Sequence, residues 1–135
     1  MVYIDKYVKL NSLTRVQSQI YPTSNLNLKY RNMNFMTCKG NVDQKNNGYI
    51  NGWLACKENG NWKDCGNVGI FFIADARIDD YFICTSRERP DVNKYLSVPK
   101  GEFGFEGFIR KQQGKAYLGF FHDSDVILCD NINIQ

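Results

Sequence analysis

The stretch Val68-Gly69-Ile70-Phe71-Phe72-Ile73-Ala74 is an almost continuous apolar run, as expected of a central β-strand buried on both faces. Asp79-Asp80 predicts a turn after it, and Tyr81–Thr85 predicts the returning strand. Three more strands are expected at 103–110, 116–122 and 126–129, with turn residues between them. Strands at this spacing indicate an all-β fold, an antiparallel β-sandwich.

Upstream of this run, the segment Lys39–Gly48 is rich in Asn, Gly and charged residues and predicts a loop that leads into a strand at Tyr49–Cys56. From Asn25 to Arg31 apolar and polar residues alternate, which predicts a half-buried strand. Downstream, Pro90 is suited to the first position of a helix, so one short helix is expected over Asp91–Tyr95.

The first 22 residues differ from the rest of the chain. Apolar residues recur three or four positions apart between Tyr3 and Ile20, and Pro22 ends the pattern. We therefore divide the chain into an N-terminal arm, 1–22, and a β-sandwich domain, 23–135. The arm is either a helical or irregular segment packed on the sandwich or the juxtamembrane continuation of a transmembrane helix. Its first residues do not form a signal peptide. Because the cysteines discussed below suggest a domain outside the cytoplasm, which needs an export signal, a fragment of a membrane protein is expected.

Composition excludes several classes of function. The chain has 135 residues, enough for one domain with its own core, and a formal net charge of +3. Its basic residues are scattered and form no stripe with interleaved aromatic residues, so no nucleic-acid partner is expected. The five cysteines include no pair with CxxC spacing, and no phosphate-cradling loop is present. The sequence therefore predicts no metal and no cofactor.

The cysteines instead suggest disulfides. Cys56 and Cys65 flank a polar stretch with Asn59-Gly60 at its middle, which predicts a hairpin whose base is closed by a disulfide. Cys38 and Cys129 lie near the first and last strands of the sandwich, which are often neighbours, so they form the second candidate pair. Disulfides would place the domain outside the cytoplasm. The alternative is that all five cysteines are reduced and serve as small core residues.

Several clusters of polar and acidic residues could in principle form a catalytic site. His122 is followed by Asp123, Ser124 and Asp125, but consecutive residues cannot converge as a Ser-His-Asp triad does. Asp123-x-Asp125 resembles a metal-chelating pair of some glycosyltransferases, but a turn is the better interpretation because no nucleotide-binding context surrounds it. The other acids are too unspecific to predict a glycosidase pair: Asp75, Asp79, Asp80, Glu88 and Asp91. No catalytic residue is therefore predicted.

Three residues are candidates for carbohydrate binding. Trp62 lies in a polar loop and could stack on the apolar face of a sugar, with packing inside the loop as the alternative. Arg87 and Arg89 stand beside Pro90 and could form a polar ligand site. The alternative for Arg89 is a structural ion pair with Asp91.

Three short motifs occur in fixed order: Gly52-Trp53-Leu54-Ala55, Arg89-Pro90-Asp91-Val92 and Gly104-Phe105-Glu106-Gly107-Phe108. With the strands between them, from about Cys38 to Cys129, they resemble the extracytoplasmic β-sandwich domain of bacterial polytopic membrane glycosyltransferases, such as those that add glucose to O-antigen. The cysteine-flanked hairpin is not part of that pattern. In such an enzyme the catalytic carboxylates belong to the membrane-embedded part, so no catalytic residue carries over to this chain.

The resemblance implies a non-catalytic periplasmic accessory domain, tethered to the inner membrane, that takes part in O-antigen (lipopolysaccharide) modification. Its expected partners are the membrane-embedded part of the same protein and a polysaccharide or lipid-linked glycan. The alternative is a stand-alone secreted carbohydrate-binding or adhesin-like module. A small β-sandwich hydrolase is a third class, but the sequence offers it no convergent site.

Overall fold

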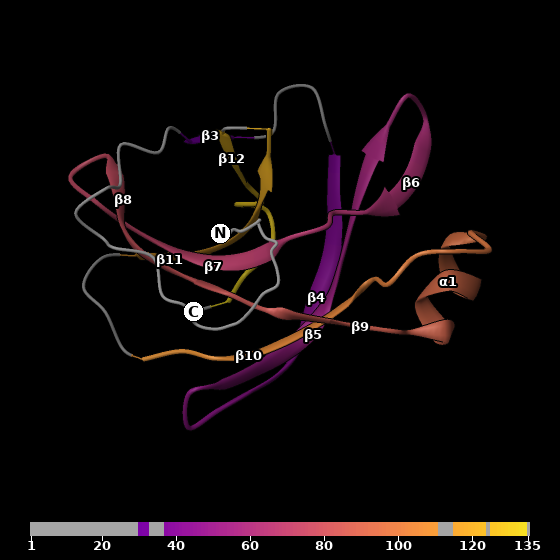
Figure 1. The fold of residues 1–135 in the computed structure, drawn as a ribbon, viewed down its shortest axis with the longest axis horizontal. Helices are drawn as coiled ribbons and strands as arrows, with labels where there is room; N and C mark the ends of the chain where they lie inside the picture. Colours follow the sequence, from indigo (N-terminus) through magenta and orange to yellow (C-terminus); the bar gives the residue numbers. More distant parts are fainter. Residues whose placement is uncertain (1–29, 33–36, 111–114, 124, 135) are drawn as a thin grey trace.

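The computed structural model describes residues 30–32, 37–110, 115–123 and 125–134, which form two β-sheets and one short helix (Figure 1). The first sheet has the strand order β4-β5-β10-β9, with β6 paired to β5, and the second has the order β3-β12-β11-β7-β8. This architecture confirms the predicted all-β, sandwich-like fold. The elements are β3 (Tyr30–Asn32), β4 (Thr37–Asn46), β5 (Tyr49–Glu58), β6 (Asn61–Asp64), β7 (Val68–Ala74), β8 (Arg77–Ile83), β9 (Thr85–Arg87), α1 (Pro90–Leu96), β10 (Gly104–Phe108), β11 (Lys115–His122) and β12 (Asp125–Leu128).

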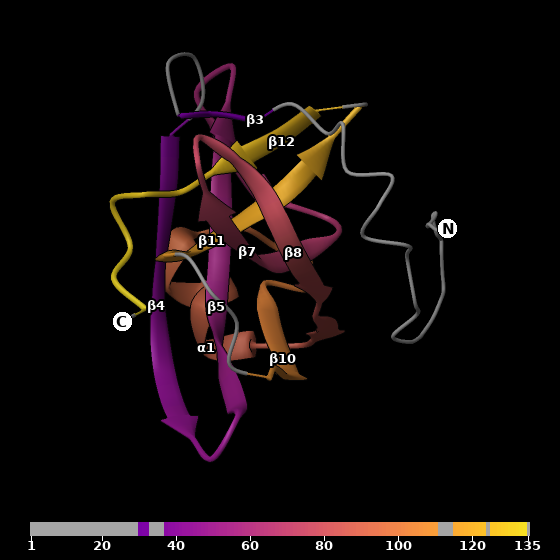
Figure 2. The ribbon, with the colours of Figure 1, turned by 90° about the vertical axis from the view of Figure 1, so that its left-hand side faces the viewer.

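The apolar run 68–74 forms β7, which pairs with β8 on one side and β11 on the other, both antiparallel. Its first five residues are buried, as expected for a strand covered on both faces. Among the described strands, the one parallel pairing joins β12 to β3. In Figure 2, β7 and β11 cross β4 and β5 at an angle, so the two sheets lie against each other as separate layers.

The main core lies between the two sheets. Ile50 and Leu54 of β5 and Phe105 of β10 come from the first sheet, and each is at most 1% exposed. They belong to the same buried cluster as side chains of the second sheet: Ile70, Phe72, Leu118, Phe120 and Ile127. Because side chains alternate along a strand, the residues between these ones lie on the outer faces. The outer faces therefore carry the candidate sites.

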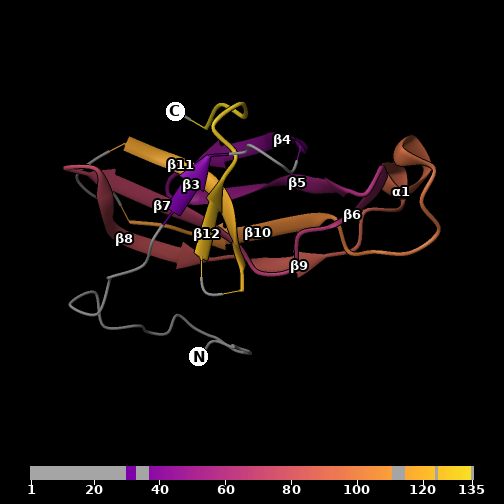
Figure 3. The ribbon, with the colours of Figure 1, turned by 90° about the horizontal axis from the view of Figure 1, so that it is seen from above.

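Helix α1 covers one end of the outer face of the first sheet, the end that also carries β6 (Figures 1 and 3). Its buried residues Val92 and Leu96 form a second cluster with Ala55 and Phe103, against which Trp53 and Trp62 pack. Pro90 occupies the start of the helix, as predicted. Ser97 ends it in the left-handed conformation, with φ of 59°.

Two turn predictions were wrong. The predicted loop Lys39–Gly48 is mostly strand β4, and only Asn47 and Gly48, with φ of 51° and 84°, form the turn. The edge strand β4 carries two apolar side chains, Cys38 and Val42, on its inner positions and is polar from Asp43 to Asn46, so its apolar alternation is weak. Likewise, Asp79 and Asp80 lie inside β8, and the turn is at Asp75-Ala76, where φ is 52° and 61°. The predicted arm, 1–22, and the start of the predicted strand, 25–29, lie outside the described residues.

Both predicted disulfides are confirmed. Cys56 is bonded to Cys65, and Cys38 is bonded to Cys129 across 91 residues of sequence. Cys84 is a free, buried thiol. Two disulfides suggest an oxidising, extracytoplasmic environment. In the part of the chain that the structure describes, no helix is long and apolar enough to cross a membrane.

Candidate functional site

The three sequence motifs meet on the first sheet. Trp53 of β5 pairs with Gly104 of β10, and Gly104 pairs in turn with Arg87 of β9. A Cβ atom at Gly104 would lie 2.7 Å from Cγ of Arg89 and 2.8 Å from the carbonyl oxygen of Arg87. Glycine is therefore required for the close packing of Arg89 on the sheet. The first and third motifs therefore lie side by side in the sheet on which α1 rests, and α1 begins inside the second motif.

Arg89 connects the start of α1 to β4. Its Nε and Nη2 atoms donate to the two carboxylate oxygens of Asp91, both at 2.9 Å, and its Nη1 atom donates to Oδ2 of Asp43 at 2.7 Å. The hydrogen bonds from Arg89, together with its charge, hold the pKa of Asp91 below the ordinary value, while desolvation opposes this shift. The guanidinium is thus occupied by two carboxylates, which is the arrangement of a structural clasp.

Arg87 is exposed on β9 and forms an ion pair with Glu106 of β10. The same carboxylate accepts a hydrogen bond from the hydroxyl of Tyr49 at 2.8 Å. Desolvation is the largest influence on the pKa of Glu106 and raises it, but the hydrogen bonds from Tyr49 and Arg87 and the charge of Arg87 outweigh it, so the pKa is lowered. Arg87 therefore lies in an accessible polar network and not beside Trp62.

Trp62 lies on β6, where it pairs with Lys57 of β5. Its ring is half-buried against the α1 cluster, and two ammonium groups lie over it, that of Lys57 at 5.2 Å and that of Lys39 at 5.8 Å from the ring centroid. Lys39 also lies 4.8 Å from the ring centroid of the exposed Tyr95. Trp62 therefore packs against the α1 cluster, and part of its ring remains accessible.

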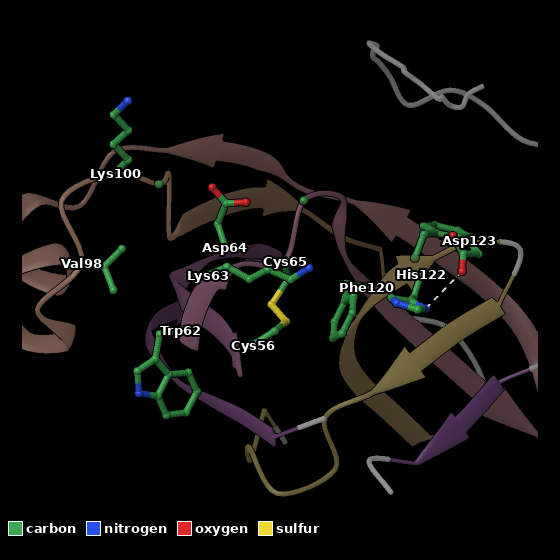
Figure 4. Close-up of a pocket in the computed structure, with 13 residues that line it drawn as sticks. Cys56, Trp62, Lys63, Asp64, Cys65, Val98, Lys100, Phe120, His122 and Asp123 are labelled. Carbon is green, nitrogen blue, oxygen red and sulfur yellow. Dashed lines mark ion pairs between the residues drawn. A yellow bond between two sulfur atoms is a disulfide. The ribbon is translucent and has the colours of Figure 1, made fainter. Parts of the chain in front are cut away.

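An open depression of about 740 Å³ lies beside Trp62 (Figure 4). The Cys56–Cys65 disulfide lies between Trp62 on one side and Phe120, His122 and Asp123 on the other. The imidazole Nδ1 of His122 is 3.7 Å from a carboxylate oxygen of Asp123. Further hydrogen-bonding groups line the depression, namely those of Lys63, Asp64 and Lys100. The depression therefore offers an aromatic edge and several polar groups to a ligand.

The acids considered for catalysis are spread over the molecule. Asp75, Asp79 and Asp80 lie at or near β8 in the second sheet, whereas Asp91 is paired with Arg89 on α1. Asp80 is half-buried, and desolvation raises the pKa of its carboxyl group. Within the described ranges, no group of three or more His, Cys, Asp or Glu residues is placed to hold a metal ion.

Two exposed aromatic residues were not singled out from the sequence: Tyr95, which is 62% exposed, and Phe108, which is 76% exposed. Tyr95 belongs to α1, and Phe108 is the last residue of β10. The alternation Phe105-Glu106-Gly107-Phe108 places Phe108 on the same face as Glu106, opposite the buried Phe105. This alternation in the sequence could have predicted that Phe108 is exposed.

Comparison of the chain with family models, curated proteins and solved structures finds no match.

Proposed function

We propose that this chain is a non-catalytic, extracytoplasmic glycan-binding domain that serves as an accessory domain of a bacterial inner-membrane glycosyltransferase modifying surface polysaccharide. The observation that supports glycan binding is Trp62, whose partly accessible ring stands at the edge of the open depression. Sugar rings stack on aromatic side chains through their C–H faces, while their hydroxyl groups need hydrogen-bonding partners. The depression supplies both kinds of group.

The accessory role is supported by the order of the three motifs, which resembles the extracytoplasmic domain of O-antigen glucosyltransferases. The two disulfides are consistent with a periplasmic location. The partners proposed on this basis are the membrane-embedded part of the same protein, which would carry out the transfer, and a polysaccharide or lipid-linked acceptor. The function of this domain would be to hold that acceptor near the membrane.

Binding can be tested by titrating the oxidised domain with O-antigen oligosaccharides while following amide shifts and tryptophan fluorescence. We expect affinity in the millimolar range, because one or two stacked rings must offset the entropy lost on association. Shifts should gather around Trp62, and Trp62→Leu should weaken binding. Tyr117→Leu is the matched control, because Tyr117 is also half-buried beneath a lysine, with Nζ of Lys115 at 5.5 Å, but lies on the second sheet.

Two results would contradict the proposed function. Absence of binding to every oligosaccharide would refute glycan recognition, and turnover of a sugar donor by this chain alone would refute the non-catalytic role. The gene sequence that precedes residue 1 tests the accessory role. A series of hydrophobic helices encoded there would support it, whereas a cleaved signal peptide would favour a stand-alone secreted binding module.

A further inference from the structure

Helix α1 covers only part of the outer face of the first sheet. The remaining part, here termed the open face, extends along β5 and β10 away from α1 (Figure 1). The strand register pairs Asn51 with Gln44 and Glu106, and Tyr49 with Phe108. Paired residues in an antiparallel sheet point to the same side, so these side chains share one surface with Arg87. The open face consists of Gln44, Tyr49, Asn51, Arg87, Glu106 and Phe108.

Two aromatic rings form the apolar part of the open face. The centroids of Tyr49 and Phe108 are 5.1 Å apart, and the rings are tilted by 53°. Phe108 is 76% exposed, so most of its ring is free of contact with the described residues. A single exposed phenylalanine is common on a protein surface. Here, however, the ring is held against a second aromatic residue that is itself anchored by hydrogen bonds.

The polar part is a connected network. The hydroxyl of Tyr49 donates to Glu106 at 2.8 Å and accepts from Nδ2 of Asn51 at 3.1 Å, and the same Nδ2 donates to Oε1 of Gln44 at 2.9 Å. Arg87 completes the network through its ion pair with Glu106. The amide oxygen of Asn51 is buried and has no hydrogen-bond partner among the residues that the structure describes. A buried acceptor without a partner costs free energy, so its presence on this face calls for a functional explanation.

We propose that the open face is a second glycan-binding surface, which takes a neutral pyranose chain by stacking it on Phe108 and Tyr49. The inference rests on the proposed glycan-binding function and gives it a site separate from Trp62. Hydroxyl groups of the sugar bind the amides of Gln44 and Asn51 and the carboxylate of Glu106. The network holds the face in place before binding, which lowers the entropic cost.

The charges of the open face favour a neutral sugar. Glu106 is balanced by Arg87, and the other four residues are uncharged at neutral pH. A uronic acid or a phosphorylated sugar would bring a negative charge close to Glu106 without a free cation of the open face to receive it. Ligands with a flat, uncharged ring surface therefore suit the face best.

The test uses the oxidised domain, with cellohexaose, laminarihexaose, maltohexaose and O-antigen fragments as neutral probes and hexagalacturonate as the acidic probe. Phe108→Ala removes an exposed ring, so the fold is retained. Tyr95→Ala is the control, because Tyr95 is similarly exposed, at 62%, but lies on α1. We expect Phe108→Ala to weaken binding of the best neutral probe about tenfold, the size of one lost stacking contact, with little change for Tyr95→Ala.

Amide shifts on binding should gather at Tyr49, Asn51 and Glu106 in the wild type. If glycans bind but shifts gather at Trp62 and Phe108→Ala binds as tightly as the wild type, the open face is not a site, although the proposed function stands. Preferential binding of hexagalacturonate at the open face would refute the predicted neutrality. If no probe binds at millimolar concentration, the open-face site and the proposed function fail together.

Discussion

Cys38 and Cys56 lie directly opposite each other on β4 and β5, yet each is bonded to a different cysteine, Cys38 to Cys129 and Cys56 to Cys65. The bridges begin side by side and lead to different parts of the molecule. Cys129 directly follows β12 of the second sheet, so its bond fastens the two sheets together. Cys65 follows β6, so its bond fixes the hairpin that carries Trp62. The connectivity thus depends on the placement of the other strands and not on the β4–β5 register.

The two bridges should contribute unequally to stability. The Cys38–Cys129 bond spans 91 residues and the Cys56–Cys65 bond spans 9, and a longer closed loop removes more entropy from the unfolded chain. Replacing Cys38 and Cys129 with Ala should lower the free energy of unfolding by about 4–5 kcal/mol, against about 2.5–3 kcal/mol for Cys56 and Cys65. Urea denaturation of both double variants measures this. An equal or reversed order would contradict the loop-entropy explanation.

Cys84 should be unreactive in the native protein. Burial is the main cause that raises the pKa of its thiol to about 12, and the charge of Glu106 adds to this effect. At pH 8 the thiol therefore stays protonated and inaccessible. Iodoacetamide labelling followed by mass spectrometry should give no adduct without denaturant and a single adduct in guanidinium chloride. Rapid labelling of the native protein would show that the region around Cys84 opens.

A methyl group at Gly52 should destabilise the first sheet. A Cβ atom there would lie 2.1 Å from the carbonyl oxygen of Asn41 and 3.0 Å from Cα of Val42, and backbone atoms of a paired strand cannot easily move. We expect Gly52→Ala to cost about 2–3 kcal/mol. Gly107→Ala is the control, because the nearest atom, Sγ of Cys84, lies 3.3 Å away, and its cost should be under about 1 kcal/mol. Similar melting temperatures for the two variants would contradict this packing.

The Arg89–Asp91 clasp predicts a pH-dependent stability difference. Hydrogen bonding to Arg89 lowers the pKa of Asp91 from its ordinary value of 3.8. The stabilisation is therefore complete above the pKa of the unfolded chain and is lost as pH falls through the lower pKa of the folded state. The melting temperature of wild type should exceed that of Asp91→Asn above about pH 5, and the difference should shrink as pH falls below 3.8 and through the lowered pKa of the folded state. Glu88→Gln, which removes a nearby exposed carboxylate outside the clasp, is the control.

Features set by local sequence were the easiest to predict. The uninterrupted apolar residues of β7 and the proline at the start of α1 each act within one element. The turn at Asp75-Ala76 was missed because alanine rarely adopts a positive φ, so nothing in its identity signals a turn. Strand β4 was missed because its apolar alternation is limited to Cys38 and Val42, and the rest of this edge strand is polar.

The candidate sites depend on contacts between distant segments. Trp62 could be selected from its own surroundings, since it is an aromatic residue in a polar hairpin. The proximity of Tyr49 and Phe108, by contrast, arises from the register of β5 with β10, which places these two residues opposite each other. Neither composition nor periodicity signals this pairing. The ion pair of Arg89 with Asp43 likewise requires the strand order of the sheet. Residue types therefore indicated aromatic and charged candidates, while only tertiary pairing shows which of them act together.

The bond between Cys38 and Cys129 also determines how the domain responds to tension. It encloses nearly the whole sandwich, from the start of β4 to the residue after β12. A force that pulls on the chain outside these two cysteines can separate β3, which precedes Cys38, from β12, but beyond β3 it passes through the covalent bond. The enclosed strands therefore cannot be pulled away from one another until a reductant opens the bond.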